Sequence, residues 1–533
     1  MKRTLLSIVC LTLMSFYSYS QTWVQQGLGW NLSSVEGVMN ISIVSPQIVW
    51  VAASDGSGGS VAVQDFSRTV DGGTTWTPGK VNNATGLSNS MITAINADTA
   101  WMAMFKLSGS NSQGVYKTTD GGTTWTRQAT APYSGSASFP DWIYFWDANN
   151  GIVLGDPINN EFEIYTTTNG GTQWTLLPSA NIPAPVSGET GYTGDFSVVG
   201  DHLWFGTAKG RVYASSDRGQ HWTVATPPNF SGKNSYPAFK DSLNGLAIKF
   251  YTGADTLNLL DASSDGGATY TAVSYHGSVL TGDIKAVPGS ANTYVTTGWD
   301  GTDQGTGRMG VTYSLDGGDT WITDPSINGT GLTCSSWFND STGWVGAFNS
   351  GTTDGIYKFS GVLAPPVSNF MTPDTLIALG GKATFTSLST GAPTSYAWTF
   401  TGGVPATSTL KNPPPITYNA PGSYDVKLVV TNLFGSNTLT KTNYIHVGGV
   451  GINELNQKNI ISVYPNPVKD MMTVQANSNI KEIDLYNMTG ELVISQVVNS
   501  TKTNVNTTGL STGIYSLKAI LDNGIITKKI VIQ

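Results

Sequence analysis

TTDGGTTW, residues 118–125, is a turn-forming segment that ends in a large aromatic residue. Five close copies occur elsewhere in the chain: TVDGGTTW at 69–76, TTNGGTQW at 167–174, SSDRGQHW at 215–222, SSDGGATY at 263–270 and SLDGGDTW at 314–321. The third residues of the copies, at 71, 120, 169, 217, 265 and 316, are 49, 49, 48, 48 and 51 positions apart. A period of this length is typical of propellers and solenoids. We call these six segments the repeated turns.

The residues around each repeated turn predict short β-strands. One strand precedes the turn, as at 114–117, and another follows it, as at 125–127. Farther upstream, each unit has a hairpin with small or polar turn residues, as at 144–155, 238–248 and 336–348. Four short strands per unit form one blade of a β-propeller.

The two ends of the repeat region predict how many blades there are. Residues 333–360 provide three strands of a further unit that no repeated turn follows, and residues 22–25 look like a fourth strand that no unit precedes. Joining these fragments completes a seventh blade and removes two unpaired sheet edges. Seven units of about 49 residues need about 343, and 21–361 contains 341. We therefore expect a seven-bladed β-propeller over 21–361, closed by the N-terminal strand.

The residue types in the repeated turns favour a structural role. Glycine supplies backbone angles that other residues resist, and an Asp or Asn side chain accepts hydrogen bonds from nearby amides. The final Trp or Tyr offers a large apolar surface that can pack between blades. Asn169 replaces Asp in one copy, which preserves the hydrogen bonding but would abolish a general acid. The residues expected to hold the turns are Asp71, Trp76, Asp120, Trp125, Asn169, Trp174, Asp217, Trp222, Asp265, Tyr270, Asp316 and Trp321.

These turns resemble the Asp-box, or BNR, repeat of sialidases, sortilin-type receptors and several glycoside hydrolases. The resemblance covers 21–361 and implies that the turns lie at the blade periphery, away from the central binding face. It implies no single activity, because the repeat occurs in proteins with unrelated functions. Sialidases also need an arginine cluster, and the family's Arg-Ile-Pro motif is missing here. The arginines of this region are Arg68, Arg127, Arg211, Arg218 and Arg308.

No catalytic, metal-binding or cofactor motif stands out elsewhere, and we predict no catalytic residue, no metal ligand and no cofactor. The four histidines lack metal-ligand spacing, and phosphate-loop, nucleophile-elbow and zinc-protease motifs are missing. A glycoside hydrolase would need two converging carboxylates. Carboxylates outside the repeated turns include Asp147, Asp156, Glu161, Glu163, Glu189, Asp195, Asp283, Asp300 and Asp303. Aromatic residues that could stack on sugars, or simply fill the blade core, include Trp142, Trp146, Trp204, Trp299 and Trp337.

Composition indicates an exported protein with several domains. The chain has 533 residues, too many for one core, and its 12% charged residues are about half the usual share. The net charge of −8 is spread thinly, so nothing suggests nucleic-acid binding. Residues 1–20 have a short positive start and an apolar stretch over 5–16, which predicts a signal peptide. After it no segment is long enough to span a membrane, and Cys334 is left without a disulfide partner.

Residues 367–448 follow a stiff Ala-Pro-Pro connector and predict a small β-sandwich. Strands are expected at 383–385, 396–400 and 422–430. The segments YAWTF and YNAPGSYDVKLVVTNLFGS resemble the polycystic-kidney-disease (PKD) domain. The family's Trp-Asp-Phe-Gly-Asp-Gly is altered to WTFTGG at 398–403, which removes the acidic residues of that motif. The resemblance implies a spacer, or a weak contact to glycan or protein.

Residues 449–459 are a polar linker, and 460–533 form the last module. Its VYPNPVKDMMTV, IDLYNMTGELV and LSTGIYSLKAI segments resemble the C-terminal sorting domain of the type IX secretion system of Bacteroidetes. We expect another small β-sandwich, with Pro465 and Pro467 fixing the start of its first strand. The resemblance implies export to the periplasm, then passage across the outer membrane through contact between 460–533 and the secretion machinery.

These observations favour a secreted or cell-surface protein that is not an enzyme. Its propeller is expected to be a binding platform for a polysaccharide or protein ligand. The alternative is a glycoside hydrolase that acts at the central face of the propeller.

Overall fold

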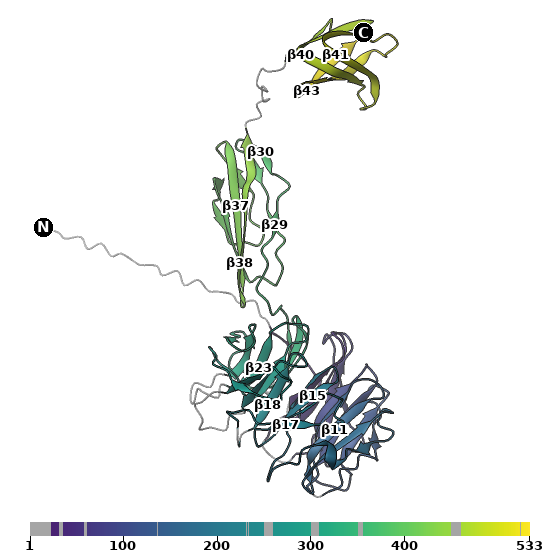
Figure 1. Ribbon diagram of the computed structural model, residues 1–533, viewed down its shortest axis with the longest axis vertical. Coiled ribbons are helices and arrows are strands. Elements are labelled where there is room, and N and C mark those ends of the chain that lie inside the picture. The colour runs from purple at the N-terminus through teal and green to yellow at the C-terminus, as the bar shows by residue number, and fades with distance from the viewer. Residues whose placement is uncertain are drawn as a thin grey trace, which may run out of the picture.

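The computed structural model describes residues 23–30, 36–57, 61–135, 137–230, 232, 234–249, 259–299, 309–349, 355–448, 460–522 and 524–533. The predicted signal peptide at 1–20 and the predicted linker at 449–459 lie outside these residues. Strands dominate the described chain, and its one helical element is the short 3-10 helix η1 (Ser179–Asn181). Seven four-stranded sheets come first, and two smaller β-domains follow (Figure 1).

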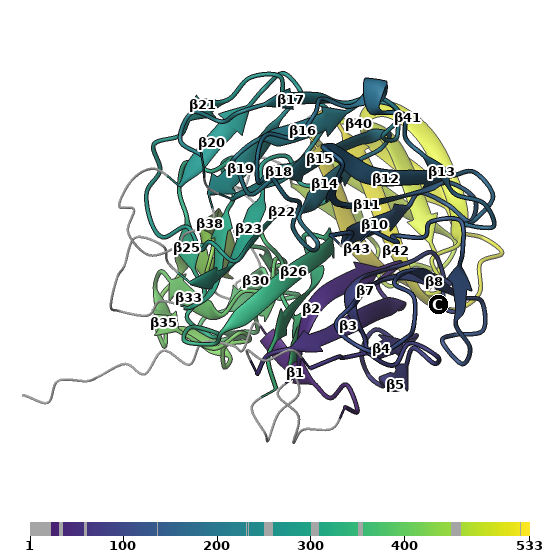
Figure 2. The same cartoon turned by 90° about the horizontal axis from the view of Figure 1, so that it is seen from below.

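The seven sheets are the blades of a propeller, and we number them in chain order. The first strands of blades 1 to 7 are β2 (Glu36–Ile43), β6 (Leu87–Ala94), β10 (Pro140–Phe145), β14 (Phe196–Val199), β18 (Ser235–Phe239), β22 (Asp283–Ala286) and β26 (Leu332–Asn339). The second strands are β3 (Val49–Asp55), β7 (Ala100–Lys106), β11 (Gly151–Ile158), β15 (His202–Gly206), β19 (Gly245–Lys249), β23 (Tyr294–Trp299) and β27 (Thr342–Ala347). First strands of different blades surround the centre (Figure 2).

In blades 1 to 6, the outer half of the blade carries a repeated turn between the third and fourth strands. The third strands are β4 (Asp65–Thr69), β8 (Gly114–Thr118), β12 (Glu161–Thr167), β16 (Val212–Ser215), β20 (Leu260–Ser263), β24 (Met309–Ser314) and β28 (Ile356–Phe359). The fourth strands are β5 (Thr77–Lys80), β9 (Thr126–Gln128), β13 (Thr175–Leu176), β17 (Thr223–Ala225), β21 (Thr271–Ala272), β25 (Ile322–Thr323) and, in blade 7, β1 (Trp23–Gln26).

Blade 7 joins the two ends of the repeat region. β1 pairs antiparallel with β28 from Trp23 opposite Phe359 to Gln26 opposite Ile356. The Trp23 side chain is buried, and its indole Nε1 donates to Asp324 Oδ2 and to the Tyr313 hydroxyl, both at 3.0 Å. The predicted fold, a seven-bladed propeller closed by its N-terminal strand, is therefore confirmed.

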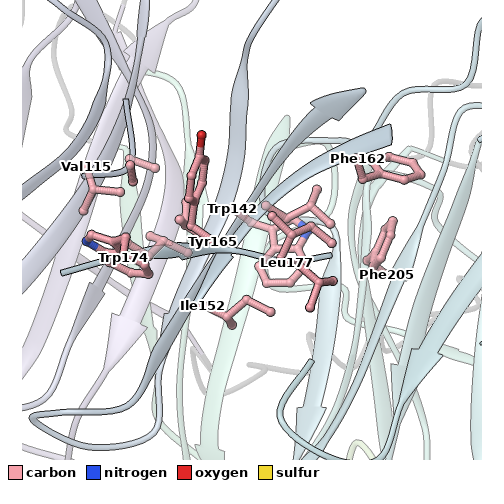
Figure 3. Packing of buried hydrophobic residues seen from close by; sticks show 14 of the residues in the cluster. Val115, Trp142, Ile152, Phe162, Tyr165, Trp174, Leu177 and Phe205 are labelled. Atoms are coloured by element: carbon pink, nitrogen blue, oxygen red, sulfur yellow. The ribbon is translucent and has the colours of Figure 1, made fainter. Parts of the chain in front are cut away.

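The strands give the propeller two faces. Because neighbouring strands are antiparallel, the first-to-second turns and the repeated turns lie together on one face, which we call the turn face. The second-to-third loops and the connections between blades lie on the other face, which we call the loop face. Apolar side chains fill the space between blades, as Val115, Trp142 and Phe205 do in one cluster that joins blades 2, 3 and 4 (Figure 3).

The second domain is a β-sandwich with Trp398 and Phe400 in its core. One sheet contains β30 (Leu376–Ala378), β38 (Gly435–Gly448), β37 (Gly422–Asn432), β33 (Ser395–Phe400) and β35 (Thr407–Ser408). The remaining strands are β29 (Phe370–Met371), β31 (Lys382–Ala383), β32 (Thr386–Ser387), β34 (Gly403–Val404) and β36 (Ile416–Tyr418). The single strand predicted at 383–385 is wrong, because β31 pairs with β36 while β32 pairs with β29, and the buried Phe385 lies between them.

This sandwich contacts the propeller through the turn between β37 and β38. The Phe434 ring packs edge-on against Tyr313 at 5.3 Å between centroids. Asn432 Nδ2 donates to the Ala364 carbonyl at 2.8 Å, and Leu433 packs against the cluster that contains Trp23. The turn between β37 and β38 therefore packs against the same apolar cluster that holds β1 in blade 7.

The third domain is built from β39 (Ile461–Tyr464), β40 (Met471–Tyr486), β41 (Leu492–Asn506), β42 (Gly513–Leu521) and β43 (Gly524–Ile532). The first half of β40 pairs with β39 and its second half pairs with β42, so this strand contributes to both layers around one apolar core. The prediction for Pro465 and Pro467 is wrong. They follow β39 and precede β40, because Ile461 and its neighbours already pair with β40.

Candidate functional site on the loop face

The acidic side chains of the repeated turns are bound within their own turns. Asp120 Oδ1 accepts hydrogen bonds from the Thr124 amide at 2.9 Å and the Thr118 hydroxyl at 2.8 Å, and Oδ2 accepts from the Thr124 hydroxyl at 2.6 Å. These bonds, led by that of the Thr124 hydroxyl, lower the pKa of Asp120 to about 2. Asn169 Oδ1 makes the equivalent contacts, to the Gln173 amide at 2.9 Å and the Thr167 hydroxyl at 3.0 Å.

Each repeated turn is also bound to the first-to-second turn of its own blade. The residue after the Asp or Asn donates its amide to a carbonyl of that turn at 2.9, 3.0, 2.8, 2.9, 2.9 and 2.9 Å in blades 1 to 6. This residue is glycine in five copies, with a positive φ, and Arg218 with φ 58° in the fourth copy. The donor and acceptor pairs are Gly72–Gln47, Gly121–Asp98, Gly170–Asn149, Arg218–Asp201, Gly266–Leu243 and Gly317–Asn292.

Aromatic residues connect the repeated turns to the preceding blade. Trp101 of blade 2 stacks on Phe145 of blade 3 at 3.5 Å and donates its indole Nε1 to the Gly170 carbonyl at 3.2 Å. Trp204 of blade 4 makes the same pair of contacts with blade 5, through Phe239 and the Gly266 carbonyl. Sequence reasoning named Trp204 only as a residue for sugar stacking or the blade core and missed the other second-strand tryptophans, although the recurrence of Trp50, Trp101, Trp204 and Trp344 is visible in the sequence.

The aromatic residues that end the repeated turns are mostly buried. Trp125 contacts Phe66 of the preceding blade at 5.4 Å between ring centroids, and Trp174 contacts Phe145 of its own blade at 5.7 Å. Trp222, Tyr270 and Trp321 are also buried, and Trp76 is partly buried. The Asp and Asn side chains are exposed or partly exposed on the turn face: Asp71, Asp120, Asn169, Asp217, Asp265 and Asp316.

A central cavity of about 530 Å³ is lined by residues of all seven first strands, and none of its lining residues belongs to a repeated turn. Asp283 is the one carboxylate among the described residues of this lining. Its Oδ2 accepts from the Ser335 amide at 2.8 Å, and its Oδ1 lies 2.9 Å from the Lys285 ammonium. Cys334 also lines the cavity, and burial raises the pKa of its thiol to about 12. Among the described residues of this lining, the carboxylate is therefore bound and the thiol is held in its protonated form.

Two carboxyl groups are buried where first strands begin on the loop face. The Asp141 and Asp195 side chains are each 2% exposed, and the Oδ2 of each has no hydrogen-bond partner among the described residues. A Cβ atom on Gly191 would lie 2.6 Å from Asp141 Oδ2, so glycine backbone covers this carboxyl closely. Burial raises the pKa of both groups well above the usual range. Asp156 and Asp195 raise the pKa of Asp141 further, whereas Lys285 lowers that of Asp195 in part and Asp283 raises it. Asp141 was not among the sequence candidates.

A polar groove of about 760 Å³ lies on the loop face between blades 2 and 3. Its lining includes Lys106, Gln113, Arg127, Phe139 and Asp156. We call it the blade 2–3 groove. Asp156 is its one carboxylate, and burial raises the pKa of this group to about 6.

The other candidate carboxylates do not form a catalytic pair in the described structure. Glu189 is buried against Arg211 and accepts from the Thr207 hydroxyl at 2.6 Å, and Glu163 accepts from the Tyr165 hydroxyl at 2.8 Å. Asp147 binds the amides of its own turn, and Glu161 is exposed. Asp300 and Asp303 lie outside the described residues.

The remaining sequence candidates are mostly structural. Trp142, Trp204 and Trp337 are buried, whereas Trp146 is partly buried beneath the Arg218 guanidinium. The Trp299 side chain lies outside the described part of the structure. Arg68, Arg127, Arg211 and Arg218 each bind a different part of the propeller, and Arg308 is not described.

Comparison with known proteins identifies the two C-terminal modules. The family model "PKD domain" matches residues 369–445, and the model "Secretion system C-terminal sorting domain" matches residues 462–533. A comparison with curated protein sequences finds no significant match.

Solved structures with a similar fold include two of YCF48. The structure described as "YCF48 bound to D1 peptide" is 16% identical, with 64% of this chain and 97% of that chain covered and a TM-score of 0.44. YCF48 from Cyanidioschyzon merolae is 15% identical, with 64% and 98% covered and a TM-score of 0.32. PorZ of Porphyromonas gingivalis, a surface component of the type IX secretion system, is 12% identical, with 93% and 75% covered and a TM-score of 0.29.

The sorting domain determines the destination of the chain. Its match at 462–533 shows export through the type IX secretion system, to the cell surface or the medium, and thus contact with the secretion machinery. In the described residues, no helix has the length and apolar character needed to span a bilayer. The predicted localisation is confirmed: the protein is a type IX secretion cargo that carries a propeller and a PKD domain.

Proposed function

We propose that this protein is a non-catalytic binding protein of the cell surface or medium. The propeller presents its loop face to a polysaccharide or protein ligand, and the PKD domain acts as a spacer to the sorting domain. The repeated turns act as Asp-box turns that hold the blades together. Their carboxylates are hydrogen-bonded within the turns and lie on the turn face, which supports this structural role.

One observation carries the proposal: among the residues that the structure describes, neither cavity is lined by two carboxylates. Asp283 is the acidic residue in the described lining of the central cavity, and Asp156 is the one in that of the blade 2–3 groove. A glycoside hydrolase needs two carboxyl groups facing one another across the substrate, about 5–10 Å apart. Because Asp283 is already bound to Lys285 and Ser335, it is not free to act as an acid or a nucleophile.

The experiment measures retention and hydrolysis with one preparation. The full chain, purified from culture medium, is run through native gels that contain starch, xylan, mannan, laminarin, dextran or pectin, and is offered immobilised outer-surface proteins of the same cells. The proposal predicts retention by a ligand of one of these two classes and no release of reducing ends from any polysaccharide. Release of reducing ends that Asp156→Asn abolishes would overturn it in favour of the hydrolase, and failure to bind either class would refute it.

A further inference from the structure

The blade 2–3 groove has walls that side chains hold in place. Gln113 accepts the Lys106 amide through Oε1 at 2.9 Å, and its Nε2 donates to the Tyr133 and Ser138 carbonyls, both at 2.7 Å. The loop between β7 and β8 is thereby fixed to the connection between blades 2 and 3. Such bonds make a groove preformed, which lowers the entropic cost of binding.

Two more side chains complete this support. The Arg127 guanidinium donates to the Gln113 carbonyl through Nε at 3.0 Å and Nη2 at 2.9 Å, and to the Pro132 carbonyl at 3.0 Å. Glu163, from β12, binds the Ser138 hydroxyl. Gln113 and Arg127 bind backbone carbonyls of this connection, and Glu163 binds a hydroxyl group in it. These three side chains therefore hold the connection between blades 2 and 3 in one shape.

The backbone of the groove wall is strained at one residue. Tyr133 has a φ of 44°, in the left-handed region that a bulky side chain rarely adopts. Its ring is buried and its hydroxyl donates to the Glu163 carbonyl at 3.1 Å, which holds the residue in this conformation. Strained residues persist where the surrounding structure enforces them, and they cluster at ligand-binding sites.

The groups that remain free in the groove define the chemistry of a ligand. Asp156 Oδ1 accepts the Gly191 amide at 3.0 Å, while its Oδ2 and the Lys106 ammonium have no partner among the described residues. Phe139 lines the groove, is partly exposed and packs against Phe105, at 4.4 Å between ring centroids. The groove thus offers one aromatic face, one hydrogen-bond acceptor and one donor.

A pyranose ring matches this set of groups. The C–H bonds on one face of the sugar can stack on Phe139, one hydroxyl can donate to Asp156 and another can accept from Lys106. A peptide anchor of the usual kind would instead need a deep apolar pocket, and polar atoms predominate in this lining. We infer that the blade 2–3 groove binds a pyranose residue of a polysaccharide. This inference rests on the proposed function and narrows its ligand to a glycan.

Two substitutions test the groove without touching its supports. Phe139→Ala removes the stacking face, and Asp156→Asn keeps the Gly191 bond but loses the negative acceptor. Each is expected to raise the dissociation constant for the retained polysaccharide about tenfold, the effect of one lost contact. Matched controls on the turn face, Phe338→Ala and Asp98→Asn, are expected to bind as wild type. Melting curves show whether each variant is folded.

The outcomes separate this inference from the proposed function. Retention of a polysaccharide with weaker binding by both groove variants supports the inference. Unchanged binding by both folded groove variants, or binding of surface protein without any glycan, overturns it while the binding-protein proposal stands. If neither glycan nor protein is bound, both fail.

Discussion

An Asp side chain such as Asp120, which binds one amide and two hydroxyls in its own turn, holds that turn in shape, and Asn can replace most of these contacts. In the third copy Asn169 does so naturally, with its amide oxygen at 2.9 Å from the Gln173 amide. The oxygen that Asp120 turns toward the Thr124 hydroxyl is the part that Asn cannot reproduce as an acceptor. At the Asp or Asn position of the repeated turns, the placement of the acceptor oxygen therefore matters more for the stability of the turn than the negative charge does.

We predict that Asp120→Asn changes the melting temperature of the propeller little, whereas Asp120→Ala lowers it by a few degrees. Alanine leaves the Thr124 amide and hydroxyl without their acceptor and frees the turn. Differential scanning calorimetry of the full chain measures the effect, with the exposed Glu161→Ala as a matched loss of a carboxylate. Equal melting temperatures for Asp120→Ala and wild type would show that the turn carboxylate is not a clamp.

The buried carboxyl group of Asp141 is expected to make the stability of the folded protein depend on pH. Burial, and then Asp156 and Asp195, raise its pKa in the folded protein well above the value of about 3.9 in unfolded chains. The folded state therefore holds this proton more tightly, so the stability that Asp141 contributes is full below about pH 4 and is lost as pH rises toward the folded pKa. The substitution Asp141→Asn mimics the protonated carboxyl group, so the variant should keep its stability as the pH rises.

We expect Asp141→Asn to be more stable than wild type at pH 7.5 by about 1 kcal/mol or more, one unit of pKa shift being worth about 1.4 kcal/mol. At pH 4 the two proteins should unfold alike. Guanidinium unfolding at both pH values makes the comparison. A variant that is less stable than wild type at pH 7.5 would mean that the buried carboxylate is charged and bound to an undetected partner.

The hydrogen bonds of the Asp and Asn side chains in the repeated turns could be predicted from the sequence, because they join residues at most four positions apart. Asp141 could not. Its burial depends on Gly191, which lies 50 residues away and is brought over blade 3 by the connection that precedes β14. The roles of Trp101 and Trp204 were equally hard to predict, since each of these side chains binds the blade that follows its own.

At the scale of elements, β1 determines whether the ring is closed. Four residues pair with β28, but Trp23 supplies most of the apolar contact, with Trp337 and Phe359 at 5.9 and 5.3 Å between ring centroids. The same indole shares Asp324 with Tyr313, and Tyr313 packs against Phe434 of the PKD domain. The cluster around Trp23 and Tyr313 therefore stabilises both the closure of the propeller and its contact with the PKD domain.

Substitution of Trp23 should accordingly destabilise the whole propeller. We predict that Trp23→Ala lowers the free energy of unfolding by about 3–5 kcal/mol through the cavity that it leaves. Trp23→Phe should cost about 1–3 kcal/mol, because Asp324 then loses a buried donor. Val24→Ala, in the same strand but with a side chain 46% exposed, should cost less than about 0.5 kcal/mol. Equal losses at Trp23 and Val24 in guanidinium unfolding would contradict the closure.

The sequence predicted these elements well where a pattern repeats and poorly where pairing is irregular. The propeller strands could be predicted because the repeated turns recur at a fixed spacing. Closure could be predicted because residues 333–360 supply three strands of a blade and residues 22–25 supply the fourth. The PKD strand expected at 383–385 failed because the chain changes sheets there around the buried Phe385. The contact of Asn432 with Ala364 joins residues 68 positions apart and leaves no local signal.

At the scale of the whole molecule, the sorting domain and the propeller have separate tasks. The domain matched at 462–533 has its own apolar core, and its strands pair with one another. We predict that a chain lacking 460–533 folds its propeller but accumulates in the periplasm. Immunoblots of medium, surface and periplasmic fractions measure this. Normal amounts of the truncated chain in the medium would contradict the assignment.

The fold of the molecule could be predicted because the period, the strand patterns and the two C-terminal motifs all lie in consecutive residues. The groove could not. Its aromatic face, Phe139, and its carboxylate, Asp156, come from different elements, and Gln113 and Arg127 shape it through contacts with loop backbone. Asp156 was a sequence candidate, but nothing in the sequence separated it from the other carboxylates.

Hydrogen exchange of the full chain with and without its bound polysaccharide tests most directly that the loop face binds and the turn face is structural. The account predicts slower amide exchange at 111–113, 133–135 and 137–139, which line the blade 2–3 groove, and unchanged exchange in the six repeated turns. Slower exchange in the repeated turns, with the loop face unchanged, would contradict it.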